Sequence, residues 1–153
     1  MADGKYLSWE IEGQKQLSRR LQIMAEKVKN WTPAFKEAAM TLKDTFQNDV
    51  FASQGGVIDE SWSPLKKAYA LQKAKKYPGK GILEATGDMR NGFMTLWRPD
   101  MAKVWNQVEY FKYHQSNKPR MSNLPRRVMM KLGNRQRVEV VKIFHTHFQS
   151  VVK

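Results

Sequence analysis

Residues 32–56 read TPAFKEAAMTLKDTFQNDVFASQGG, and this stretch decides the fold. Apolar side chains recur along it at helical spacing, at Phe35, Ala38, Ala39, Leu42, Phe46 and Val50. The pattern predicts one amphipathic helix that begins at Thr32-Pro33 and ends near Ser53, about 20 residues or roughly 30 Å later. Thr32 is the expected N-cap, because Pro33 at the first helical position loses no hydrogen bond. Gln54-Gly55-Gly56 stops the helix.

Two further elements precede this helix. Apolar residues at steps of four, three and four predict an earlier helix over about residues 14–29, with one face made of Leu17, Leu21, Met24 and Val28. Before it, Leu7, Trp9 and Ile11 alternate with Ser8, Glu10 and Glu12. A period of two predicts a half-buried strand over residues 6–12, with the charges on its wet face.

Shorter elements follow the long helix. Ser63-Pro64 repeats the cap-and-proline signal and predicts a helix to about residue 76. Thr86 is expected to cap a short helix through Met89 and Phe93, and residues 94–97 and 102–109 form a predicted hairpin. Trp105 falls on the polar side of that hairpin, which suggests cover by another element or another chain.

The last third contains less regular sequence. Residues 110–115 predict a single helical turn, residues 116–125 a loop, and residues 126–132 a short strand or a turn. Asn134 begins a closing helix whose expected apolar face consists of Val140, Val141, Phe144, Phe148 and Val151. The expected fold is α+β in a single domain over 1–153: two long N-terminal helices, a small antiparallel sheet with a hairpin, and a closing C-terminal helix.

Charge is distributed unevenly along the 153 residues, whose net charge is +13. Residues 1–63 hold eight basic and nine acidic side chains (8 − 9 = −1), whereas residues 64–153 hold nineteen and five (19 − 5 = +14). A basic surface without matching acids is either a solvated face or a surface that meets nucleic acid or an acidic partner. The candidates for such a surface are Lys66, Lys67, Lys73, Lys75, Lys76, Arg120, Arg126, Arg127, Arg135 and Arg137.

Several classes of function are disfavoured. The chain has no cysteine, which excludes disulfides and thiolate metal sites. His145 and His147 are two residues apart on a predicted helix and cannot share a metal ion, and His114 follows aromatic residues, as a packed structural histidine would. The carboxylates do not converge and there is no phosphate-binding loop, so we expect no enzyme, no cofactor and no metal. No apolar run is long enough for a membrane span, and residues 1–12 do not read as a secretory signal.

Short motifs in a particular order carry a resemblance. The long helix and its Gln-Gly loop precede Trp-Ser-Pro-Leu at residues 62–65, Leu-Glu-Ala-Thr-Gly at 83–87, Tyr110 with His114-Gln115, and Leu-Pro-Arg-Arg at 124–127. This order resembles the virion-morphogenesis, or tail-completion, family of Mu-like and related contractile-tailed bacteriophages. The residues carried over from the family motifs, each with a structural role, are Trp62, Pro64, Leu65, Thr86, Gly87, Tyr110, His114, Gln115 and Pro125.

The resemblance implies a structural protein of the virion that completes the tail at the head–tail junction and is made in the host cytoplasm. It implies a ring of copies, with a hexamer as one candidate and a monomer as the isolated form, in contact with tail and head-connector proteins and close to phage DNA. The alternative from charge alone is a sequence-independent nucleic-acid-binding protein that acts outside the virion.

Overall fold

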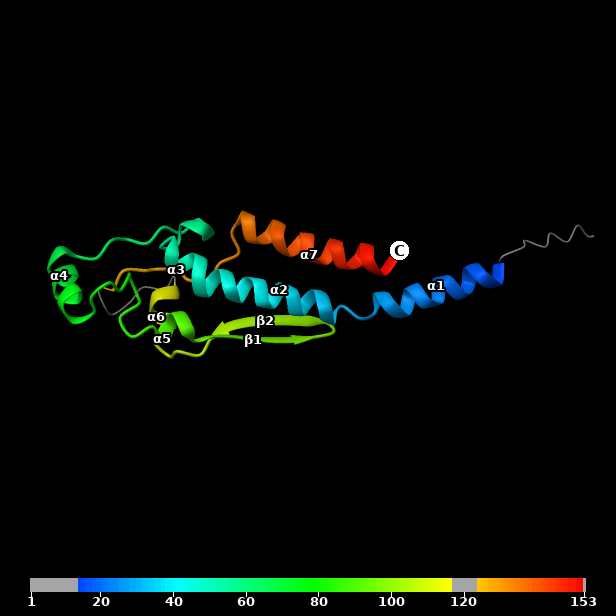
Figure 1. Ribbon diagram of the computed structural model, residues 1–153, viewed down its shortest axis with the longest axis horizontal. Helices are drawn as coiled ribbons and strands as arrows, with labels where there is room; N and C mark the ends of the chain where they lie inside the picture. Colours follow the sequence, from blue (N-terminus) through cyan, green and yellow to red (C-terminus); the bar gives the residue numbers. More distant parts are fainter. Residues whose placement is uncertain (1–13, 117–123, 153) are drawn as a thin grey trace, which may run out of the picture.

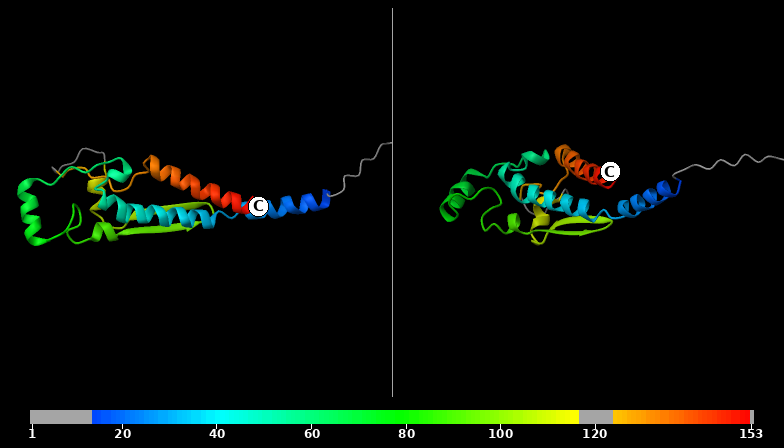
Figure 2. Two further views of the ribbon diagram at one scale, coloured as in Figure 1. Left: turned by 45° about the horizontal axis from the view of Figure 1, so that its top comes forward. Right: turned by 45° about the vertical axis from the view of Figure 1, so that its right-hand side comes forward.

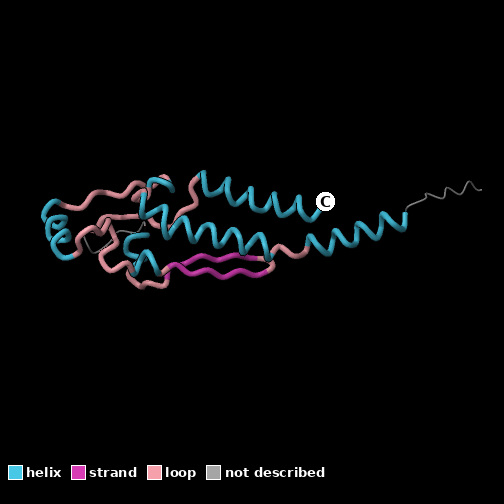
Figure 3. The backbone as a smooth tube through the Cα atoms, viewed as in Figure 1, coloured by secondary structure: helices cyan, strands magenta, loops and turns pink. Residues whose placement is uncertain are grey.

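A computed structural model describes residues 14–116 and 124–152. A long central helix lies between a two-stranded hairpin on one side and the C-terminal helix on the other (Figures 1 and 3). The predicted α+β class, with its N-terminal helices, hairpin and closing helix, is confirmed. The strand expected over residues 6–12 lies outside the described residues. The elements are α1 Gln14–Val28, α2 Thr32–Asp44, η1 Thr45–Asp49, α3 Val50–Ala52, η2 Gly56–Ile58, α4 Lys67–Lys76, α5 Asp88–Asn91, β1 Phe93–Arg98, β2 Met101–Asn106, α6 Phe111–Gln115 and α7 Asn134–Val152.

The central helix runs continuously through α2, η1 and α3, with one wider π-helical turn at η1. Its start differs from the prediction by one residue. Trp31 occupies the N-cap, while the Thr32 N–H donates to Asn30 Oδ1 at 3.1 Å. Thr32 is therefore already helical, and the side chain of Asn30 satisfies its free amide.

The hairpin packs one of its faces on α2. Arg98 pairs with Met101, so Pro99 and Asp100 alone make the turn. Phe93 is fully buried against Phe46, with ring centroids 6.2 Å apart, which aligns the hairpin along the central helix.

The outer face of the hairpin exposes apolar side chains, Met94, Leu96 and Met101. Trp105 pairs with Met94 on this face and is half-buried, with the Lys103 ammonium 5.4 Å from its ring centroid. The alternation along β2 thus correctly placed Trp105 on the outer side of the hairpin.

Helix α7 lies on the other side of α2, but its buried face differs from the prediction (Figure 1). Ile143 is buried against Ala34 and Ala38, with Val140 and Phe144 packed beside it. Val141, at 67% exposure, and Phe148, at 45%, point away from the core. The predicted face was right for Val140 and Phe144 and wrong for Val141 and Phe148. The polar residue Gln136 is buried on the packed side instead, where its amide donates to the Val57 carbonyl at 3.0 Å.

Helix α1 matches its predicted span but leaves the body of the molecule (Figures 1 and 2). Leu17 and Leu21, expected on an apolar face, are 59% and 55% exposed. Met24 and Val28 are half-buried where the helix passes the end of α7. Most of the apolar stripe of α1 is therefore not covered by the described part of its own chain.

The main core lies at the opposite end of the molecule from α1 (Figure 1). Trp62 anchors the loop after α3: its ring packs edge-on against Phe51 at 5.4 Å, and its Nε1 donates to the Val128 carbonyl at 2.7 Å. The core consists of Phe46, Val50, Phe51, Ile58, Trp62, Ile82, Met89, Phe93, Val128 and Met129.

Two of the shorter helices begin later than predicted. Helix α4 starts at Lys67 rather than at residue 64, because the Ser63 and Pro64 carbonyls accept hydrogen bonds from Arg127 and that backbone stays extended. Helix α5 starts at Asp88 after Gly87, whose φ of 86° favours glycine.

The structure differs from the sequence prediction at two further places. Phe93 belongs to β1 and not to the short helix expected after Thr86. Residues 126–132 form neither a ladder-paired strand nor a turn but an extended segment that enters the core.

Gly55 is required by the turn that follows the central helix. Its φ is +86°, and a Cβ there would lie 2.0 Å from the Glu60 carbonyl oxygen and 2.7 Å from the Trp62 ring. Gly79 has a similar φ of +73° but no heavy atom within 4 Å of such a Cβ.

We expect Gly55→Ala to lower the free energy of unfolding by more than about 3 kcal/mol, because backbone strain adds to the clash. Gly79→Ala, the matched control, should cost about 1–2 kcal/mol from strain alone. Urea unfolding followed by tryptophan fluorescence measures both, and equal losses would contradict the structural role given to Gly55.

Candidate functional site

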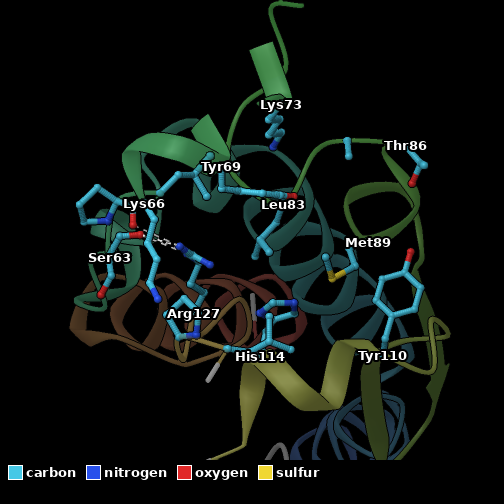
Figure 4. A pocket seen from close by; sticks show the side chains of 15 residues that line it. Ser63, Lys66, Tyr69, Lys73, Leu83, Thr86, Met89, Tyr110, His114 and Arg127 are labelled. Atoms are coloured by element: carbon cyan, nitrogen blue, oxygen red, sulfur yellow. Dashed lines mark hydrogen bonds between the residues drawn. The ribbon is translucent and has the colours of Figure 1, made fainter. Parts of the chain in front are cut away.

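A pocket of about 680 Å³ opens between α4, α5, α6 and residues 124–127 (Figure 4). Stretches far apart in the sequence meet there, and each holds one of the predicted motifs. The motif residues that line it are Pro64, Leu65, Thr86, Tyr110, His114 and Pro125. Trp62, Gly87 and Gln115 do not line the pocket and instead support its walls.

The extended segment 126–130 forms the base of this region and is held largely by side chains. Gln115 Oε1 accepts the Met129 and Met130 N–H groups at 2.9 and 3.1 Å, and Gln115 Nε2 donates to the Met130 carbonyl. Together with the bond from Trp62 to Val128, these contacts replace the partner strand that the segment lacks.

His114 is buried, as expected for a packed histidine, and its carbonyl accepts the Arg127 N–H at 3.0 Å. The motif at residues 110–115 therefore contributes to segment 126–130 through its backbone as well as through Gln115.

Arg127, a candidate to face DNA or an acidic partner, is 4% exposed and so is not part of the outer surface. Its Nε and Nη2 donate to the Ser63 carbonyl at 3.2 and 2.9 Å, and Nη2 also reaches the Pro64 carbonyl at 3.4 Å. Burial lowers the pKa of Arg127, since removal from water disfavours the charged form. The side chain still binds carbonyls as a cation and joins the motif at 62–65 to segment 126–130.

Lys73 is also buried, at 6% exposure, and its Nζ donates to the Gly81 carbonyl. Burial is the main cause that lowers its pKa; Glu84 partly offsets this and the charge of Arg127 adds to it. Glu84 itself pairs with Arg90 at 2.8 Å. Among the described residues, no carboxylate lies within ion-pair distance of Lys73 or Arg127.

The other predicted basic residues lie outside the pocket or at its rim. Lys66 is exposed at the rim, and Lys67, Lys75 and Lys76 are exposed on α4. Arg135 and Arg137 are exposed at the start of α7, and Arg120 lies outside the described residues. The pocket thus brings together Lys66, Lys73 and Arg127.

Arg126 belongs to a separate contact. Its Nη1 lies 3.8 Å from Glu60 Oε2, and the Lys131 Nζ lies 2.7 Å from Glu60 Oε1. The hydrogen bond from Lys131 lowers the pKa of Glu60, with the charges of Lys131 and Arg126 acting in the same direction against burial.

The residues predicted for the site did not include Tyr69 or Leu83, although Leu83 begins the motif at 83–87. Tyr69 precedes Lys73 by four residues on α4, a spacing that places two side chains on one helix face and could have indicated the pair. Leu83 has a φ of +63°, which a leucine adopts only when its surroundings require it, and no sequence pattern indicates this.

Residues 14–116 and 124–152 contain neither a metal-binding cluster nor a helix able to span a membrane. That part of the chain contains no group of three or more metal-binding side chains. None of its helices combines the length and apolar character that a membrane span needs. His145 is exposed, whereas the His147 Nε2 lies 3.1 Å from the Asn30 carbonyl and joins α7 to the turn before α2.

Comparison with known proteins gives one match. The sequence pattern of the phage virion morphogenesis family matches residues 13–149. No curated protein and no solved structure matches the chain significantly.

Gln115→Ala should lower the free energy of unfolding by about 3 kcal/mol, because the N–H groups of Met129 and Met130 and the Met130 carbonyl, all at least partly buried, lose their partner. Lys112→Ala, an exposed position on the same helix, serves as the control and should change stability by no more than about 0.5 kcal/mol. Chemical denaturation measures both; a loss for Gln115→Ala no greater than the control's would show that segment 126–130 is held by other groups.

Glu60→Gln tests the surface pairs of Lys131 and Arg126. Because the pKa of Glu60 is lowered from its ordinary value of 4.5, its stabilising effect is present above that value and is lost as the pH falls through the folded-state pKa. At neutral pH we expect the free energy of unfolding of the wild type to exceed that of the variant by about 1 kcal/mol or less. Unfolding curves from neutral to acidic pH should converge; a difference that persists in acid would contradict the assignment.

Proposed function

The chain belongs to the phage virion morphogenesis family, and on that premise we propose that it is a structural protein of the head–tail junction that completes the tail and supports head–tail joining. The family match over residues 13–149 carries the proposal, since it spans nearly all of the 153 residues.

Exposed apolar side chains support assembly into a ring with other copies. They occur on three elements: Leu17, Leu21 and Ile23 on α1; Met94, Leu96 and Met101 on the hairpin; Val138, Val141 and Phe148 on α7. Apolar surface of this kind marks sites of protein contact when it is contiguous. Copies in a ring, and neighbouring tail and connector proteins, would cover these surfaces, and the isolated subunit can remain monomeric.

The basic part of the chain supports a position beside DNA. Residues 64–153 carry the whole excess of positive charge, and on α4 Lys67, Lys75 and Lys76 are exposed. Phosphates attract such a surface without regard to sequence, which suits a subunit around the path of passing DNA.

The same charge favours the alternative function, a nucleic-acid-binding protein outside the virion. The two differ in location. Immunolabelling of purified virions in electron microscopy should place the protein at the head–tail junction, and phage without it should accumulate heads and tails that do not join. Absence of the protein from virions, together with DNA binding in infected cells, would favour the alternative.

Reversing the exposed charges of α4 tests the DNA-facing role. We expect Lys67→Glu, Lys75→Glu and Lys76→Glu, combined, to reduce phage titre at least about tenfold, because repulsion replaces attraction to phosphate. The matched control changes the same lysines to arginine and should keep the titre. Circular dichroism confirms the fold of both, and a normal titre for the glutamate variant would exclude this role.

A further inference from the structure

The pocket between α4, α5 and α6 holds buried positive charge in apolar surroundings. Lys73 and Arg127 contact backbone carbonyls of Gly81 and Ser63, which supply partial charges only. Leu83 and Met89 are among the apolar residues of its wall (Figure 4). A buried cation is stabilised best by an anion at close range, so this pocket suits a ligand with carboxylates beside apolar groups.

The volume of about 680 Å³ lies in the range of pockets that bind small ligands or a few side chains. Lys66 at the rim adds another positive charge, and Tyr69 offers an exposed aromatic edge. A short peptide with alternating acidic and apolar residues fits both the size and the chemistry.

This chain contains such a segment. Residues 7–12 read Leu-Ser-Trp-Glu-Ile-Glu. The odd positions are apolar, and two of the three even positions are the carboxylates Glu10 and Glu12. Residues 1–13 hold three acidic side chains and one basic side chain (1 − 3 = −2), opposite in sign to the pocket. The segment directly precedes α1, the helix that extends away from the body.

A copy cannot place this segment in its own pocket. From Gln14, seven residues of extended chain bring Leu7 no further than about 25 Å. The 15 residues of α1 span about 22 Å, and residues 32–52 of the central helix span about 31 Å beyond it. Helices α4, α5 and α6 lie at or beyond the far end of that central helix (Figures 1 and 2). Because they contribute residues to the pocket, the segment reaches only the pocket of another copy.

We propose that residues 7–12 of one copy bind in this pocket of a second copy, with Glu10 and Glu12 toward Lys73 and Arg127 and the apolar side chains against Leu83 and Met89. The contact joins one end of a subunit to the opposite end of the next, and head-to-tail contacts of this kind form a ring when the rotation between neighbours closes. The inference rests on the proposed function for the ring, and it identifies the surfaces that would form it.

Disulfide trapping in the full chain tests the contact, because the natural sequence has no cysteine. Ser8→Cys in one copy is mixed with Ser63→Cys at the pocket in another, under mild oxidation. The matched control replaces Ser63→Cys by Ser150→Cys, an exposed serine on α7 outside the pocket. We expect the first pair to cross-link at least about tenfold faster than the control, since binding raises the local thiol concentration.

A second pair of substitutions tests whether the carboxylates of Glu10 and Glu12 contribute to the contact. Glu10→Gln and Glu12→Gln, added to the Ser8→Cys copy, should slow cross-linking several-fold and remove most of its dependence on salt. Equal rates for the Ser63→Cys and Ser150→Cys pairs would overturn the proposal. So would an intramolecular disulfide as the main product of a Ser8→Cys, Ser63→Cys double variant, and an unchanged rate after the glutamine substitutions would refute the charge pairing.

The result is separable from that of the virion experiments. Specific cross-linking by a protein that is absent from virions would retain this contact and reject the head–tail role. A protein located at the junction that fails to cross-link would retain the role and reject the contact. Selective binding of an acidic segment from a different phage protein, with no cross-link between copies, would likewise reject the second copy as occupant.

Discussion

The extended segment 126–130 depends on side chains for its main-chain hydrogen bonds, and much of the structure depends on this segment. It passes through the core without a partner strand, and a buried backbone must have its polar groups paired. Trp62 donates to Val128, and Gln115 binds Met129 and Met130. Each of these side chains belongs to a different motif, so segment 126–130 joins the loop after the central helix to α6.

Arg127, a residue of the segment itself, donates hydrogen bonds from its side chain to the carbonyls of Ser63 and Pro64. With these carbonyls bound to Arg127, α4 begins only at Lys67. Arg127 also places a positive charge in the lining of the pocket, which Lys73 shares. Burying two cations within reach of each other costs stability, because desolvation and mutual repulsion act together. Departures of this kind from ordinary packing occur mostly at functional sites, and the proposed contact between copies would offset the cost.

The sequence predicted the helices with clear periodicity well. Helix α1, the central helix and the hairpin occur close to their predicted positions, because each has an apolar pattern or turn signal of its own. The face of α7 was predicted only in part: Val140 and Phe144 pack against the core, but Val141 is exposed and Gln136 is buried with its amide on the Val57 carbonyl. Periodicity treats glutamine as a surface residue and contains no information about a carbonyl 79 positions away in the chain.

By itself, the sequence determined the class of the fold, the family to which the chain belongs and the segregation of charge into residues 64–153. Those properties are local or additive, so they can be counted along the chain. Only the tertiary structure decided that Lys73 and Arg127 are buried while Lys67, Lys75 and Lys76 remain exposed. Burial depends on which distant carbonyls and apolar side chains surround a residue, and these five basic residues therefore separate into a pocket and an outer surface only when the chain folds.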